Sequence, residues 1–264
     1  SVEFISDMTI GDALNPFELY YPEIIIDKFF VSGWNWFSVN ALAEYMSLGN
    51  ILTCVTDADY IKNQTESATY YDGFGWYGSL EDAGGLDPIS LYKIKAVDPC
   101  GVSYMGIPVD VALTQIDIVP GWNWIGYLPQ CIIPIADALD SLQLEEGDYI
   151  KNQIETATYY DGFGWYGSLE ELTPGEGYMM RKGTDDILFY PEECPPASAS
   201  AKKTASADKV WAGSSLNPHQ FEYSGTVTAK VFVDGVLAGG EDDLIMAYVD
   251  DQLRGVMGGL YFDP

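Results

Sequence analysis

A 23-residue segment that occurs twice constrains the fold of this 264-residue chain more than any other feature. Residues 59–81 read DYIKNQTESATYYDGFGWYGSLE, and residues 148–170 differ from them at only two positions. A second shared motif precedes each copy, because GWNWFS at residues 33–38 returns as GWNWIG 88 residues later. A period of this length exceeds the roughly 20–50 residues of a solenoid repeat, so each copy is expected to fold as its own small domain.

The two copies are expected to span residues 22–108 and 109–195. Residues 196–209 are rich in Ala, Ser and Pro and are interpreted as a linker. Residues 210–264 have a different character: a period of two places Val227, Ala229, Val231 and Val233 on one face of a strand that ends at Asp234-Gly235. A second pair of strands is expected around Asp250-Asp251.

The signals within each copy are mostly β. An Asp-Gly turn between aromatic runs predicts a hairpin in both copies, at residues 72–73 and 161–162. One short helix per copy is indicated by apolar residues at i, i+3, i+4 and i+7. These residues are Leu48, Ile51, Leu52 and Val55, with Ser47 as the expected N-cap, and Ile135, Ala138, Leu139 and Leu142 after Pro134. The predicted fold class is therefore mainly β, with two homologous small domains, each with one short helix, and an incomplete antiparallel β-sandwich module.

Aromatic residues are the candidate ligand-binding groups. The two tryptophans of each GWNW motif alternate along a strand and should point to the same face. The hairpin aromatics crowd a short segment, so some of them must face outward. Both sets could stack on a glycan or serve as packing surfaces, and packing is the favoured interpretation. The candidates are Trp34, Trp36, Trp76, Tyr77, Trp122, Trp124, Trp165 and Tyr166.

The net charge is −28, from 40 acidic and 12 basic residues. Such a surface repels nucleic acid and anionic membranes, so nucleic acid is not an expected partner. No apolar run approaches the roughly 18 residues of a membrane span, and no signal peptide is visible. The acidic run Glu241, Asp242 and Asp243 could hold calcium, although its spacing matches no EF-hand or RTX loop, and a solvated acidic loop is the favoured interpretation.

The chain has four cysteines, which are Cys54, Cys100, Cys131 and Cys194. No two of them form a CxxC pair, which argues against a zinc site. They favour disulfides formed in an oxidising compartment, with three possible connectivities, while buried free thiols are the alternative. Asn63 begins a glycosylation triplet that the second copy lacks.

Catalytic machinery is not evident. The chain has a single histidine and no GxSxG, HExxH or phosphate-loop motif. A carboxylate pair could hydrolyse glycosides, but nothing distinguishes one pair among 40 acidic residues. The expectation is a non-enzyme without a definite cofactor, calcium being the one candidate.

The paired motifs, GWNW followed by DYIKNQ…ATYYDGFGWYGSL and a strand such as LTPGEGYMM, resemble repeats of large secreted surface proteins of adhesin or surface-layer type. The resemblance is to such proteins of Bacteroidota and to similar extracellular proteins of marine microbes. Residues 219–256 resemble a β-sandwich module that accompanies such repeats and has further strands that this chain lacks. Residues 2–19 resemble the closing segment of that module, so residues 1–21 are expected to be a terminal strand segment. The resemblance implies either a slice of a longer tandem array or a strand that completes a neighbouring subunit's sheet.

These observations predict an extracellular or cell-surface structural protein that self-associates into a polymer or tandem array. It would form part of a filament, a sheath or an adhesin stalk. The alternative is a carbohydrate-binding adhesin module that uses its aromatic faces, with or without calcium. A weaker third possibility is an accessory domain of a glycoside hydrolase.

Overall fold

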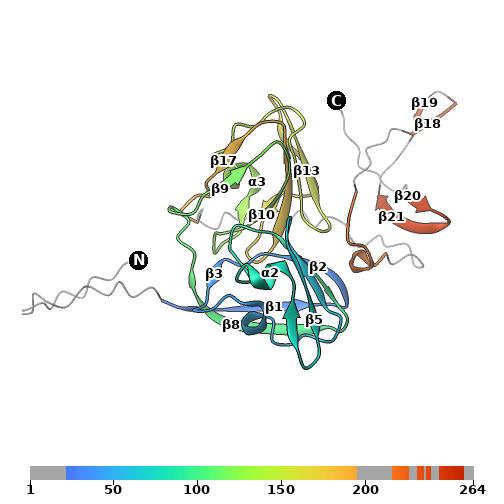
Figure 1. Cartoon of the computed structure of the whole chain (residues 1–264). Coiled ribbons are helices and arrows are strands. Elements are labelled where there is room, and N and C mark those ends of the chain that lie inside the picture. Colours follow the sequence, from blue (N-terminus) through green and yellow to red (C-terminus); the bar gives the residue numbers. More distant parts are fainter. Residues whose placement is uncertain (1–21, 195–215, 226–230, 235, 239–243, 259–264) are drawn as a thin grey trace, which may run out of the picture.

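The computed structural model describes residues 22–194, 216–225, 231–234, 236–238 and 244–258. The fold in these residues is mainly β, with antiparallel sheets and only short helices, as the sequence predicted. Figure 1 shows the two copies, here repeat 1 (residues 22–108) and repeat 2 (residues 109–194), lying against each other.

Repeat 1 contains eight strands and two short helices among its described residues. The strands are β1 (Ile24–Phe30), β2 (Gly33–Phe37), β3 (Ala41–Leu42), β4 (Tyr60–Lys62), β5 (Ser67–Tyr71), β6 (Gly75–Tyr77), β7 (Tyr92–Ala96) and β8 (Cys100–Pro108), and the helices are α1 (Leu48–Ile51) and α2 (Ser79–Asp82).

Repeat 2 contains nine strands and one short helix in the described part of the chain. The strands are β9 (Ile116–Ile118), β10 (Gly121–Gly126), β11 (Ile133–Pro134), β12 (Tyr149–Lys151), β13 (Thr156–Tyr160), β14 (Gly164–Gly167), β15 (Glu171–Leu172), β16 (Gly177–Lys182) and β17 (Asp186–Leu188), and the helix is α3 (Ile135–Ala138).

Both repeats are built on a five-stranded antiparallel sheet with the same strand order. The order is β2-β7-β4-β5-β6 in repeat 1 and β10-β16-β12-β13-β14 in repeat 2. The GWNW strand is an edge strand in each sheet, and the predicted Asp-Gly hairpin forms the opposite side. Each repeat also pairs its first strand with its last, β1 with β8 and β9 with β17.

One face of each sheet covers the core of its own repeat. In repeat 1, Phe37 lies opposite Tyr92, and Ile61 lies between Ile94 and Ala68. All five are buried in a single apolar cluster, and the corresponding residues of repeat 2 form a second cluster. Because side chains alternate along a strand, the GWNW tryptophans lie on the other face of the sheet.

The short helices differ from the sequence expectation in two ways. Ser47 precedes α1 as predicted, but its side chain makes no capping hydrogen bond. The carboxylate of Glu81 accepts the Leu48 N–H instead, at 2.9 Å. Repeat 1 also has a second helix, α2, although one helix per repeat was expected. Both repeats carry Ser-Leu-Glu here, but repeat 2 continues with the strand β15.

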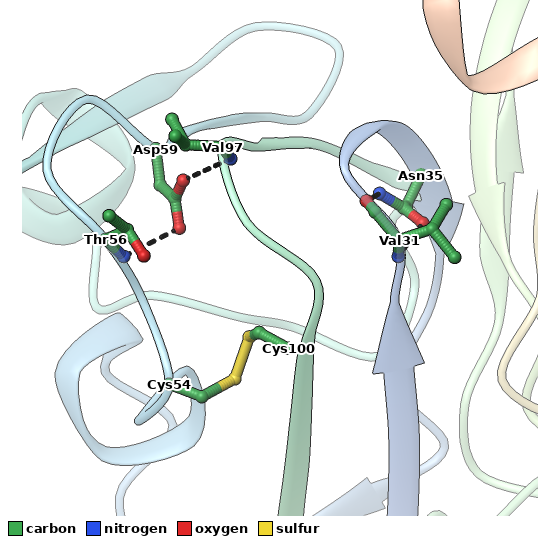
Figure 2. Close-up of a disulfide and its surroundings, with 7 residues drawn as sticks. All are labelled: Val31, Asn35, Cys54, Thr56, Asp59, Val97 and Cys100. Atoms are coloured by element: carbon green, nitrogen blue, oxygen red, sulfur yellow. Dashed lines mark hydrogen bonds between the residues drawn. A yellow bond between two sulfur atoms is a disulfide. The ribbon is translucent and has the colours of Figure 1, made fainter.

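Each repeat contains one disulfide, Cys54–Cys100 in repeat 1 and Cys131–Cys194 in repeat 2, so no thiol is free. The prediction of disulfides is confirmed, and the alternative of buried free thiols is wrong. Figure 2 shows Cys54–Cys100 beside Asp59, whose carboxylate accepts the N–H groups of Thr56 and Val97 at 3.0 and 2.7 Å. The disulfide and Asp59 thus hold the loops around α1 and β8 together.

The third region contains two hairpins in its described residues, and both occur where the sequence predicted turns. They are β18 (Val231–Val233) with β19 (Val236–Ala238), and β20 (Leu244–Val249) with β21 (Gln252–Gly258). The positive φ of Asp250 and Asp251 is typical of a two-residue type I′ turn. The expected terminal strand in residues 1–21 lies outside the described residues.

Candidate functional site

The two repeats are joined by a reciprocal pair of glutamine contacts. Gln64 Nε2 donates to the Trp122 carbonyl at 2.9 Å, and its Oε1 accepts the Trp124 N–H at 2.8 Å. Gln153 repeats this with Trp34 at 2.8 Å and Trp36 at 3.1 Å. Edge strands expose unpaired backbone groups. Each glutamine therefore occupies the edge of the GWNW strand of the other repeat.

Backbone contacts extend this junction. The Ser38 N–H donates to the Gly175 carbonyl at 3.2 Å, and the Gly126 N–H donates to the Ile89 carbonyl at 2.8 Å. A Cβ at Gly126 would clash with the carbonyl of Pro88, so this position requires glycine. Trp36, Leu91, Trp124 and Met179 pack together as an apolar cluster that both repeats share.

Three lysines lie among the GWNW tryptophans along the junction. Lys62 Nζ is 5.8 Å from the ring centre of Trp34 in its own repeat and 5.7 Å from that of Trp124 in the other. Lys151 mirrors it, at 5.5 Å from Trp122 and 5.6 Å from Trp36. These distances are within the range of cation–π attraction. We call this group the seam; it consists of Trp34, Trp36, Lys62, Lys93, Trp122, Trp124 and Lys151.

Lys93 lies at the centre of the seam and breaks its symmetry, since Met179 occupies the matching position of repeat 2. Its Nζ is 3.9 Å from the ring centre of Trp36 and 4.3 Å from that of Trp124. The side chain is fully buried. Burial, with added repulsion from Lys151 and Lys62, lowers the pKa of Lys93 from 10.5 to about 7.

This pKa predicts a pH-dependent effect of Lys93→Met, which introduces the repeat 2 residue. In the folded protein Lys93 loses its proton near pH 7, whereas in the unfolded chain it keeps it up to about pH 10.5. Burial of the charged Lys93 therefore lowers the free energy of unfolding by its full amount below pH 7. This loss becomes smaller as the pH rises towards 10.5. We expect Lys93→Met to raise the free energy of unfolding most at pH 6, with the gain shrinking steadily by pH 10.

Denaturant titrations at several pH values test this expectation, with the exposed Lys95→Met on the same strand as control. A gain for Lys93→Met that did not vary with pH would contradict it.

Residues 216–225, which we call the strap, cross the seam and contact all three lysines. Lys62 forms an ion pair with Glu222 and donates to the Tyr223 hydroxyl at 3.0 Å. Lys93 Nζ donates to the Glu222 carbonyl at 3.4 Å, and Lys151 Nζ donates to the Ser224 carbonyl at 2.6 Å. The strap thereby supplies oxygen acceptors to a cationic centre in a strongly acidic chain.

The start of the strap is anchored on repeat 1. His219 Nδ1 lies 2.6 Å from the Trp34 carbonyl oxygen and donates to it. A Cβ at Gly33 would clash with the His219 backbone, and Gly33 has a φ of +100°. This glycine thus permits the close approach. Trp34 is 8% exposed beside the strap, whereas its equivalent Trp122 is 38% exposed.

The remaining predicted aromatic residues are divided between the core and the surface. Trp76 is buried against Tyr70, and Trp165 packs in the same way on Tyr159. Tyr77 pairs edge-to-face with Tyr71 on the outer face, and Tyr166 pairs with Tyr160. The two hairpins therefore present matching outer tyrosines, and the structure does not bring these together with the seam.

The other candidates lie elsewhere. The Asn63 side chain is buried, where its Oδ1 accepts the N–H groups of Thr65 and Glu66 at 2.9 and 2.7 Å. The proposed calcium ligands Glu241, Asp242 and Asp243 lie outside the described residues. Within the described part of the chain, no group of three His, Cys, Asp or Glu residues is arranged to hold a metal ion.

The sequence analysis missed the lysines, the glutamines and the strap as parts of a site. One signal could have identified the glutamines and two of the lysines, Lys62 and Lys151: Lys-Asn-Gln recurs unchanged in both copies, although basic residues are scarce. The strap carries no comparable signal. When the chain is compared with known proteins, no family model, curated protein or solved structure gives a significant match.

Proposed function

We propose that this protein is an extracellular structural repeat protein, a subunit or segment of a surface filament, sheath or adhesin stalk. The reciprocal glutamine contacts are the observation that carries the proposal. In them, two motifs that recur unchanged in both copies, DYIKNQ and GWNW, bind each other across the junction. The repeated residues thus serve to join modules, which is what a building unit requires.

Two further features support the proposal. Each repeat is closed by its own disulfide, and disulfides are typical of oxidising compartments such as the cell exterior. The third-region hairpins expose large apolar side chains, among them Phe232, Met246 and Tyr248. Exposed apolar strands favour pairing with another chain. No helix in the described residues is long and apolar enough to cross a membrane.

Electron microscopy of the purified chain over a range of concentrations tests this function. We expect regular filaments or oligomers whose amount increases with concentration, and an intact mass that shows whether units are joined covalently. Monomers at every concentration, in solution and on the grid, would contradict the proposal.

A carbohydrate-binding role is the second candidate, favoured by the matching outer tyrosines of the two hairpins. Tyr77 is 60% exposed, and Phe74 at the same hairpin tip is 80% exposed. Exposed aromatic rings in a repeated arrangement could stack on sugar rings. A glycan array comparing the wild type with Tyr77→Ala and with Tyr77→Ala/Tyr166→Ala tests this, with circular dichroism to show that each variant is folded. Binding that survives Tyr77→Ala and Tyr166→Ala together would exclude the hairpins as the glycan site.

A further inference from the structure

We propose that the seam is a peptide-binding site for the strap, and that a second copy of this chain can supply the strap. This inference rests on the proposed function and names the contact through which copies would associate. One molecule's residues 216–225 would cross the seam of its neighbour and make the contacts that they make within one chain.

The chemistry of the seam defines its ligand as an acidic, aromatic peptide, which in the strap follows a short 3-10 helix at Pro218–Gln220. The Nζ groups of the seam's three lysines contact one carboxylate, one phenol and two backbone carbonyls of the strap. The Tyr223 ring adds a third aromatic group around Lys93, with its ring centre 4.3 Å from Lys93 Nζ. Burial alone would raise the pKa of Glu222, but hydrogen bonds with Lys62 and Tyr223 and the charge of Lys62 lower it overall. Without a strap, Lys93 would keep its like-charged neighbours and lose its carbonyl acceptor.

The strap follows repeat 2 at a distance in sequence that permits exchange. Residues 195–215 separate Cys194, the last described residue of repeat 2, from Leu216. A stretch of 21 residues can span about 70–75 Å when fully extended, by the covalent limit of roughly 3.3–3.6 Å per residue. A connection of this length does not by itself confine the strap to the seam of its own chain. Exchange of an identical element between copies keeps every native contact, so it is a low-cost route to association.

Exchanging the charges of the Lys62–Glu222 pair tests this directly. Lys62→Glu alone and Glu222→Lys alone each place like charges together within one chain. When the two variants are mixed, both pairs become complementary only if each strap crosses to the other molecule. We expect the 1:1 mixture to form heterodimers, and each variant alone to form several-fold less dimer. Labelling one variant with ¹⁵N identifies heterodimers by their intermediate mass in native mass spectrometry.

The double variant Lys62→Glu/Glu222→Lys is the control, because it restores the opposite charges within one chain. We expect it to protect Trp34 from acrylamide quenching as the wild type does, with more quenching in either single variant. A mixture that forms no more heterodimer than the single variants form homodimer would overturn the proposal, as would single variants with an undisturbed strap.

These outcomes are separable from those of the proposed function. Filaments of the wild type that persist unchanged in both single variants would support a structural role and reject strap exchange as its basis. Heterodimers from the mixture, without higher assembly of the wild type at any concentration, would support exchange and reject the filament.

Discussion

Lys182→Met is expected to lower the free energy of unfolding by about 3–5 kcal/mol, the usual cost of removing one partner from a buried ion pair. Lys182 Nζ lies 3.0 Å from Asp148 Oδ2 and 3.3 Å from Asp186 Oδ2, and it donates to the Gln143 carbonyl at 2.5 Å. The Lys182 side chain is fully buried and that of Asp148 is almost so. The substitution would leave the Asp148 carboxylate buried without its cation.

In repeat 1 the corresponding buried aspartate has its hydrogen bonds without a lysine. Ala96 occupies the position of Lys182 in the matching strand. Asp59, the counterpart of Asp148, accepts the Val97 N–H instead, as Figure 2 shows. The ion pair is therefore one of two solutions for burying the aspartate of the DYIKNQ motif.

Chemical denaturation measures the effect of Lys182→Met, with the neighbouring exposed Arg181→Met as control. The double variant Lys182→Met/Asp148→Asn removes the uncompensated charge and should recover much of the loss. If the free energy of unfolding fell by less than about 1 kcal/mol, as for a surface ion pair, Asp148 would not depend on Lys182 as its partner.

The fold class and the hairpins were predictable because they depend on local signals. The Asp-Gly turns, the alternation of aromatic residues and the apolar spacing after Pro134 each determine the structure of a few neighbouring residues. The capping of α1 was not predictable in this way, because Glu81 lies 33 residues after the N–H that it accepts. A side chain so distant in sequence can replace a local cap, and only the tertiary structure reveals it.

The candidate site was predictable only in part, for a related reason. Alternation correctly placed Trp34 and Trp36 on the same face, and packing explains them better than an open glycan surface. What covers that face is the other repeat and the strap. The Gln153 contact with Trp34 joins residues 119 positions apart, and the His219 contact with Trp34 spans 185 positions. No periodicity in the sequence marks such pairs.

Replacement of both Cys131 and Cys194 by serine is expected to destabilise the protein by about 4 kcal/mol, because the cross-link no longer restricts the unfolded chain. The sequence separation of this pair is 63, and that of Cys54 and Cys100 is 46. Since the entropy of loop closure grows only with the logarithm of length, the two losses should differ by only a few tenths of a kcal/mol. Thermal unfolding should shift downwards by roughly 8–16 °C for either pair.

We also expect each disulfide variant to unfold in a single transition. The reciprocal glutamine contacts and the shared cluster of Trp36 and Trp124 couple the two repeats, so loss of either disulfide should lower the midpoint of one common transition. Calorimetry of the two serine variants beside the wild type measures this. If removing Cys54–Cys100 instead split the unfolding into two steps, with repeat 2 unchanged, the repeats would be independent domains in contact. The junction would then join modules without making them a single cooperative unit.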